Sequence, residues 1–88
     1  MPLISMFYGI IIKMYSEKSN PHHVPHLHAE YGEEKVELSL DGEVLAGKMS
    51  PRKLRMVQVW IDIHHDELVA NWRILSEGGE AFRIKPLD

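Results

Sequence analysis

Two histidines separated by a single residue, His26 and His28, are the side chains of this sequence best suited to chemistry. Apolar and polar residues alternate from His26 to Tyr31, which is typical of a half-buried strand. Successive strand side chains point to opposite faces, so both imidazoles lie on one face and Glu30 extends the same row. Histidine titrates near neutral pH, so one imidazole of such a pair can act as an acid and the other as a base.

A second predicted strand, Ile10–Tyr15, adds polar side chains to this face. Its apolar residues alternate with Lys13 and Tyr15. If the polar sides of both strands coincide, the predicted catalytic set is Lys13, Tyr15, His26, His28 and Glu30. The alternative interpretation is that these are polar residues which an exposed strand face tolerates.

A metal site is a weaker interpretation of the same histidines. Zinc takes three or four protein ligands, and the spacing of this strand fixes only His26 and His28. A loop histidine, His22 or His23, would have to supply the third. The chain has no cysteine, which excludes thiolate zinc sites, disulfides and a cysteine nucleophile. We therefore expect no cofactor, with His23, His26 and His28 as the alternative metal-ligand set.

A basic cluster marks the start of a predicted helix. Its members are Lys48, Arg52, Lys53 and Arg55, and no acidic residue lies among them. Helix N-termini also favour anions, so this cluster could bind the phosphates of RNA or DNA, or an acidic partner. Alternatively, the charges only solvate the helix. The cluster contains no aromatic residue on which a base could stack, which weakens the nucleic-acid interpretation.

These side chains must be positioned by a small sheet. The predicted strands are Ile10–Tyr15, His26–Tyr31, Lys35–Leu40 and Glu43–Gly47, with a possible short last strand at Ala81–Ile84. Asp41-Gly42 predicts a two-residue hairpin that sets Leu38 opposite Leu45. Gly9 interrupts the first apolar segment and is predicted to mark a bulge.

Helical periodicity follows the strands. Ser50 is the predicted N-cap and Pro51 the first helical residue. An unbroken helix to Ser76 would be about 39 Å long, which is too long for a small sheet. We therefore expect a bend or break at His64–Asp66, with Asp66 as a cap and His64 as a hydrogen-bonded core residue.

The order of elements predicts an α+β fold in a single domain, 1–88. An antiparallel sheet of about four strands would be packed on one face by one long bent helix or two short ones. The other face would be partly open to water. An open sheet edge and a small core also favour a homodimer.

Length and composition limit the function. The chain has 88 residues, with 44% hydrophobic and 26% charged, which argues against disorder. Its net charge of −3 argues against a surface that tracks phosphates throughout. No basic leader and no apolar stretch of roughly 20 residues is present, so we expect a cytoplasmic protein without membrane contact.

Several segments resemble the short bacterial proteins of the domain of unknown function 4160 family. They are Met-Pro-x-Ile-Ser-x-Phe-Tyr-Gly-Ile at 1–10, Pro-His-Leu-His-Ala-Glu-Tyr at 25–31, Gly-Glu-Val-Leu-x-Gly-Lys at 42–48, Trp60 with His64, His-Asp-Glu-Leu at 65–68, and Asn71-Trp72. The family usually has an aromatic residue where this chain has Leu27, and the preceding loop carries the extra residues 22–24. The first departure implies altered packing under the histidines.

This resemblance implies a partnership with a second small protein encoded nearby, in a toxin–antitoxin-like pair. It also implies that His26 and His28 are site residues. We expect this chain to be the toxin side and to direct acid–base chemistry at RNA. Two alternatives remain open. One is a non-catalytic binding module, such as an antitoxin, adaptor or regulatory subunit, and the other is a histidine-based metal-binding protein.

Overall fold

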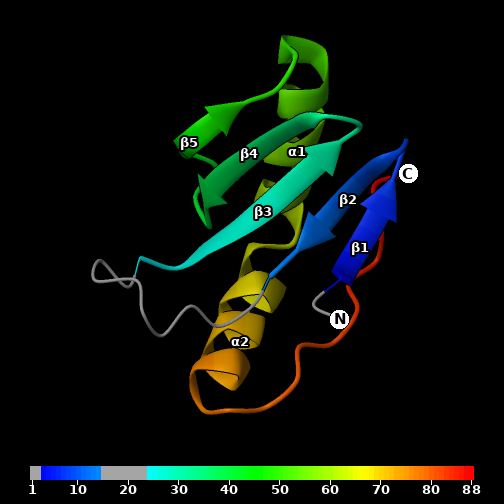
Figure 1. The fold of residues 1–88 in the computed structure, drawn as a ribbon. Coiled ribbons are helices and arrows are strands. Elements are labelled where there is room, and N and C mark those ends of the chain that lie inside the picture. The colour runs from blue at the N-terminus through cyan, green and yellow to red at the C-terminus, as the bar shows by residue number, and fades with distance from the viewer. Residues whose placement is uncertain (1–2, 15–23) are drawn as a thin grey trace.

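The computed structural model describes residues 3–14 and 24–88, which form one antiparallel sheet followed by two helices (Figure 1). The sheet is a meander in the order β1-β2-β3-β4-β5. Its strands are β1 (Leu3–Phe7), β2 (Ile10–Lys13), β3 (His26–Tyr31), β4 (Glu34–Ser39) and β5 (Val44–Lys48), and the helices are α1 (Pro51–Ile63) and α2 (His65–Ser76). The predicted α+β fold is confirmed, with five strands instead of about four.

The N-terminal apolar segment is a hairpin, not one bulged strand. Phe7 pairs with Ile10, and Tyr8 and Gly9 between them have φ values of 50° and 81°. Two successive residues with positive φ make a two-residue turn whose twist matches that of paired strands. The prediction of a bulge at Gly9 is therefore wrong, and β1 is a strand that the sequence analysis missed.

The β4–β5 hairpin also departs from the predicted register. The backbone N–H of Ser39 donates to the carbonyl of Glu43, which closes a loop in which Gly42 has a φ of 90°. Leu38 therefore pairs with Val44, and the register shifts by one residue between Leu38 and Glu37, which pairs with Ala46. Leu45 falls at this bulge and is 42% exposed, so the predicted pair of Leu38 with Leu45 is wrong. A three-residue loop that ends in a left-handed glycine accounts for the slip.

The helical segment breaks within the predicted range His64–Asp66. α1 begins at Pro51 after Ser50, and His64, with φ −107° and ψ 24°, separates α1 from α2. The residue that precedes α2 is His64, so the prediction of Asp66 as the cap is wrong, and Asp66 lies in the first turn of α2. An acidic side chain there interacts favourably with the positive end of the helix dipole.

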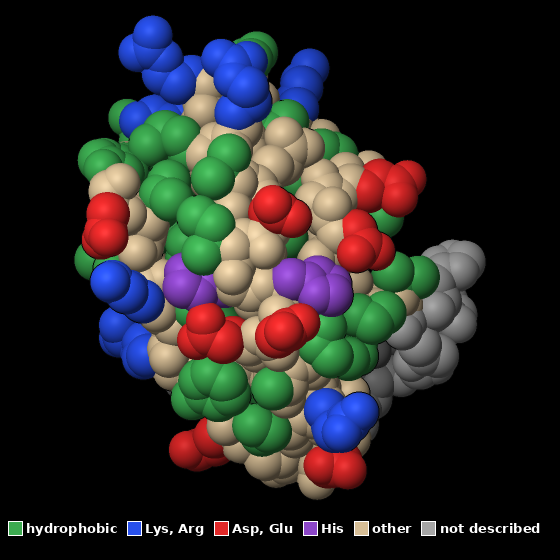
Figure 2. Space-filling model, turned by 180° about the vertical axis from the view of Figure 1, so that it is seen from behind, with side chains coloured by type: hydrophobic (Ala, Val, Ile, Leu, Met, Phe, Trp, Pro, Cys, Tyr) green, Lys and Arg blue, Asp and Glu red, His purple; other side chains and the backbone are tan. Residues whose placement is uncertain are grey.

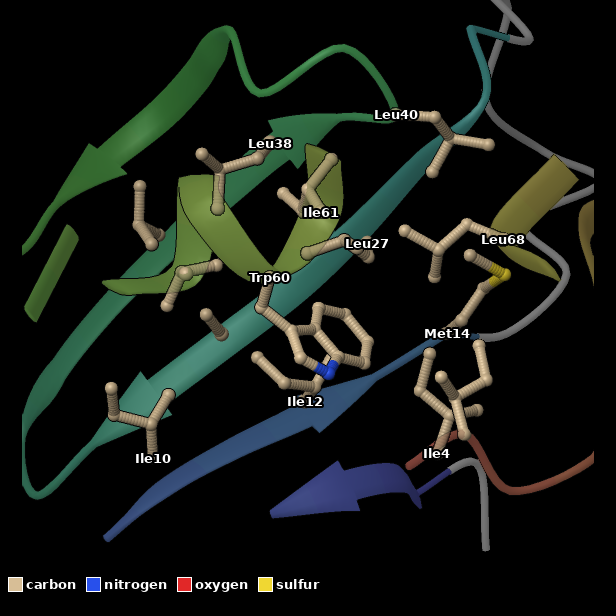
Figure 3. Close-up of a cluster of buried hydrophobic side chains, with 14 of the residues drawn as sticks. Ile4, Ile10, Ile12, Met14, Leu27, Leu38, Leu40, Trp60, Ile61 and Leu68 are labelled. Carbon is tan, nitrogen blue, oxygen red and sulfur yellow. The ribbon is translucent and has the colours of Figure 1, made fainter. Parts of the chain in front are cut away.

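The core lies between the inner face of the sheet and the helices (Figure 3). Fully buried side chains from the sheet include Ile10, Ile12 and Leu27, and they face Trp60 of α1 and Leu68 of α2. Burying each such aliphatic side chain stabilises the fold by roughly 1.5–3 kcal/mol. This apolar layer fixes which face of the sheet remains for polar side chains.

Residues 79–88 follow α2 without regular secondary structure and run beside β1 (Figure 1). The predicted strand Ala81–Ile84 is therefore wrong. One backbone hydrogen bond of 2.8 Å, from Ile84 N–H to the carbonyl of Ile4, links the segment to β1. Side chains make its other contacts: Asn71 pairs with Phe82, and Trp60 Nε1 donates to the carbonyl of Lys85 at 2.9 Å. These side-chain hydrogen bonds satisfy backbone groups that, in a strand, would bond to the backbone of the neighbouring strand.

Neither helix of the described residues combines the length and apolar character that crossing a bilayer requires.

Candidate functional site

The face of the sheet that points away from the helices carries polar side chains in cross-strand rows. Lys13, His28 and Glu37 lie opposite one another on β2, β3 and β4. Glu30 lies in the neighbouring row, opposite Lys35 on β4. The structure thus brings three predicted residues, Lys13, His28 and Glu30, onto one face. Tyr15 lies outside the described residues, as do His22 and His23.

Lys13 and Glu30 form an ion pair on this face. Lys13 Nζ lies 3.2 Å from Glu30 Oε2, and both side chains are about a quarter exposed. A pair of this exposure contributes little to stability, because water screens both charges. The ion pair keeps the side chains of Lys13 and Glu30 next to the histidines, and the Glu30 carboxylate is bound to the Lys13 ammonium.

His26 is nearly buried, which the strand pattern did not predict. Only 2% of its side chain is exposed, and its ring lies 5.2 Å from the ring of Trp72 on α2. Its Nδ1 lies 2.6 Å from the carbonyl oxygen of Val24. A carbonyl only accepts hydrogen bonds, so Nδ1 carries the proton and donates it there. In the neutral ring, Nε2 is then an acceptor with its lone pair directed at the site.

The carboxylate of Glu37 is the partner that both imidazoles share. Its Oε1 lies 3.2 Å from Nε2 of His26 and 3.7 Å from Nε2 of His28. The two rings meet edge to face with centroids 5.3 Å apart. Two acceptors such as an Nε2 lone pair and a carboxylate oxygen remain this close only when a proton or another cation lies between them. The arrangement suits proton transfer or the binding of a cation.

Glu37 is the residue that the sequence analysis missed. Its alternation with Val36 and Leu38 marks it as outward-facing, but this alone does not connect it to the histidines. The connection comes from the hairpin at Gly32-Glu33, which pairs Tyr31 with Glu34 and so sets Glu37 opposite His28. Extending that two-residue hairpin register from the sequence would have found Glu37.

A shallow hollow of about 320 Å³ lies beside these side chains on the open face. His28, Glu30, Lys35 and Glu37 line it, together with Ala29, Val36, Ala46 and Gly47. This volume is near the lower limit of small-molecule pockets, and the hollow is open to solvent. A ligand here would lie across the sheet instead of entering a deep cleft.

The basic cluster gathers at the end of the molecule where α1 begins (Figure 2). Arg52 and Arg55 are exposed, whereas the Lys53 ammonium lies 4.5 Å from the ring centroid of Tyr31. Tyr31 therefore supplies an aromatic ring next to the cluster, which the linear sequence does not show. Glu34 also lies there and accepts a 2.6 Å hydrogen bond from Ser50 N–H, so an acidic side chain is part of this end.

Lys48 connects the basic cluster to the open face. It lies on β5 opposite Lys35, whose other neighbour is Glu30 on β3. Basic side chains therefore continue from the start of α1 across β5 to the edge of the hollow. An extended anion can contact both regions.

The histidines of the helix break have local partners. His64 packs 5.5 Å from the ring of Trp60, and its Nδ1 contacts Glu67 Oε1 at 2.5 Å. Nε2 of His65 lies 3.5 Å from Asp41 on the β4–β5 loop. His64 is hydrogen-bonded, as predicted, but it is only partly buried and is not one of the buried core residues.

Comparison with known proteins identifies the family but no relative of known activity. No curated protein and no solved structure matches the chain. The family model described as Domain of unknown function (DUF4160) matches residues 9–73. The match includes β2 to β5, the histidines and Glu37, and most of both helices, and it omits β1 and the C-terminal segment. Because it covers more than half of the sequence, the chain belongs to the family of the domain of unknown function DUF4160.

Proposed function

We propose that this protein is the toxin side of a cytoplasmic toxin–antitoxin-type module and that its open sheet face directs acid–base chemistry at RNA. The observation that carries this proposal is the convergence of His26 and His28 on one oxygen of Glu37, where His28 and Glu37 are about a quarter exposed and His26 is nearly buried beside them. The partner would be a second small protein encoded nearby.

The two imidazoles can divide the work of RNA cleavage. One takes the proton from a ribose 2′-hydroxyl, whose oxygen attacks the adjacent phosphorus, and the other protonates the departing 5′-oxygen. The products are a 2′,3′-cyclic phosphate and a free 5′-hydroxyl, so no further reactant is required. His28 is the more accessible of the pair, and His26 is held by Val24 and Trp72.

The surrounding charges favour an anionic substrate. Lys13, which is paired with Glu30, lies on the same face as His28, as do Lys35 and Lys48, and the exposed Arg52 and Arg55 at the start of α1 extend the positive charge. Lysine and arginine side chains supply the salt-dependent part of nucleic-acid affinity by contacting phosphates. RNA is favoured over DNA because only RNA carries the 2′-hydroxyl that this chemistry needs.

Induced expression tests this function directly. The protein is expressed alone and together with the product of the neighbouring gene, and growth and RNA integrity are followed. We expect the protein alone to arrest growth, the partner to relieve the arrest, and His28→Ala to remove it. His65→Ala is the matched control, since His65 is a partly exposed histidine outside the site.

Two results would contradict the proposal. Unaffected growth on expression of the wild type would exclude the toxin role. Equal toxicity of the His26→Ala/His28→Ala double variant, with its fold verified by circular dichroism, would exclude catalysis by these histidines.

A non-catalytic binding module is the second candidate, and β5 favours it. Every residue of Val44–Lys48 is exposed, with Val44 and Leu45 at 40% and 42%. An edge strand of this kind can accept a strand from another chain through its backbone. Co-purification with the neighbouring gene product that is lost in Leu45→Lys, without any RNA cleavage by the wild type, would favour this function.

A further inference from the structure

We infer that His26, His28 and Glu37 form a binding site for a divalent transition-metal cation such as Zn²⁺. This inference concerns the same site as the proposed function, but it depends on ligand geometry alone and can be tested separately. Among the described residues, these three are the one group of histidine and acidic side chains whose donor atoms converge, all within 4.8 Å of one another.

The distances suit a tetrahedral ion. Zinc lies about 2.0–2.1 Å from nitrogen and oxygen ligands, so two of its ligands are separated by about 3.3 Å. The separations from Glu37 Oε1 are 3.2 Å to His26 Nε2 and 3.7 Å to His28 Nε2. The donors of His26 and His28 also lie within 4.8 Å of each other, so the side chains of His28 and Glu37, each about a quarter exposed, would have to close in around the ion when it binds.

The surroundings of His26 match those of a metal ligand. Histidines that bind metals usually donate their second ring N–H to a carbonyl or carboxylate, which fixes the tautomer and the ring orientation. Nδ1 of His26 makes such a bond to Val24, and Trp72 packs against the ring. Nε2 of this nearly buried ring is thereby aimed at the carboxylate of Glu37 before any ion arrives.

The donor types select the class of metal. Two imidazoles and one carboxylate suit zinc and neighbouring transition metals, whereas magnesium and calcium prefer oxygen ligands. Three protein ligands leave at least one coordination position for water, which is the pattern of catalytic sites. Glu30 is held by Lys13 in an ion pair and is not needed as a fourth ligand.

Titration of the metal-free protein, residues 1–88, with zinc chloride by isothermal calorimetry tests the site. We expect one ion per chain with a dissociation constant in the micromolar range or tighter. His28→Ala and Glu37→Gln should each weaken binding at least tenfold. Both side chains lie on the open face of the sheet and are about a quarter exposed, at 23% and 26%, so these variants should keep the fold. Circular dichroism and urea unfolding verify this.

Matched variants test whether other histidines act as zinc ligands. His65→Ala should bind zinc as the wild type does, although His65 lies between Asp41 and Asp66. A His22→Ala/His23→Ala double variant tests the loop histidines that the sequence suggested as ligands. If zinc binding survives in His28→Ala and Glu37→Gln, or if the wild type binds none at micromolar metal, the inference is wrong.

Two further readouts make the test specific. Cobalt(II) substituted into the site should give the visible absorption of a tetrahedral ion, and Glu37→Gln should reduce it. Magnesium and calcium should not compete with zinc. Affinity should fall as the pH is lowered, because protons compete with the metal for the imidazole nitrogens.

The outcomes for the metal and for the function can be told apart. Zinc binding that depends on His28 and Glu37, in a protein that neither arrests growth nor cleaves RNA, would support the site and contradict the proposed function. RNA cleavage by a metal-free protein that binds no zinc would support the proposed function and contradict the metal site.

Discussion

The buried amide of Asn71 should be one of the most sensitive positions in the molecule. Asn71 is fully buried, its Nδ2 donates to the carbonyl of Phe82, and its Oδ1 accepts from the N–H of Phe82, both at 2.9 Å. One side chain therefore satisfies both backbone groups of the C-terminal segment at this point. Asn71→Ala removes both bonds and leaves a small cavity.

The expected loss follows from these contacts. Each hydrogen bond contributes about 0.5–1.5 kcal/mol net, and losing the packed amide adds roughly another 1 kcal/mol. Asn71→Ala should therefore lower the free energy of unfolding by about 2–4 kcal/mol. A domain of this size has a total stability of about 4–13 kcal/mol, so the loss is a large fraction of it. The melting temperature should fall by roughly 8–30 °C.

Urea unfolding followed by tryptophan fluorescence measures this loss, since Trp60 donates to the carbonyl of Lys85 in the anchored segment and Trp72 packs against the core. Ser76→Ala is the control on the same helix: its hydroxyl makes an exposed bond to the carbonyl of Trp72, and we expect a change within about 0.5 kcal/mol. A loss below about 1 kcal/mol for Asn71→Ala would refute the reasoning.

Asn71→Asp tests the direction of the two hydrogen bonds. The ionised carboxylate can accept from the Phe82 N–H but cannot donate to the Phe82 carbonyl. At neutral pH this variant should be at least as unstable as Asn71→Ala. Protonation restores a donor, so Asn71→Asp should gain stability relative to Asn71→Ala as the pH falls. If the difference in unfolding free energy between Asn71→Asp and Asn71→Ala is the same at all pH values, the assigned directions of the two hydrogen bonds are wrong.

Two further predictions concern the β5 edge and the basic cluster. Gly47→Ala should lower the free energy of unfolding by at least about 2–3 kcal/mol, because Gly47 has a φ of 76° and a Cβ there would lie 2.3 Å from the carbonyl oxygen of Lys35. Gly32→Ala, at φ 60° with open space around it, should cost only about 1–2 kcal/mol, and equal losses in urea unfolding would contradict this explanation. Arg52→Gln/Arg55→Gln should leave stability within about 0.5 kcal/mol but weaken RNA binding and lower its salt dependence, as fluorescence anisotropy at several salt concentrations would show.

The elements that the sequence predicted well are those with a clear period. The alternation at His26–Tyr31 placed Leu27 and Ala29 in the core, and the helical stripe with its length predicted one long bent helix or two short ones, bent or broken at His64–Asp66. In these segments, burial of one face and local backbone preference agree, so the pattern is sufficient.

The errors occurred where the chain turns. The apolar residues of β1 and β2 follow one another with only Tyr8-Gly9 between them, and tyrosine rarely adopts the positive φ that this turn needs. In the loop before the bulge at Leu45, the backbone N–H groups of Asp41 and Glu43 donate hydrogen bonds to Ser39 Oγ, which no periodicity reveals.

The candidate site was predicted only in part for a related reason. His26 and His28 follow from strand alternation, but Glu37 depends on the β3–β4 register. The burial of His26 depends on Trp72, which comes from a helix much later in the chain. Spacing within one strand carries no information about such contacts.

The two edges of the sheet differ, and this difference limits how copies of the chain can assemble. The C-terminal segment lies along β1, whereas no described strand pairs with the outer edge of β5. Growth of a continuous sheet into a filament needs an open edge on both sides of each copy. With one open edge, strand addition between copies would join β5 to β5 about a two-fold axis and then stop. The anchored C-terminal segment thus makes any such association self-limiting.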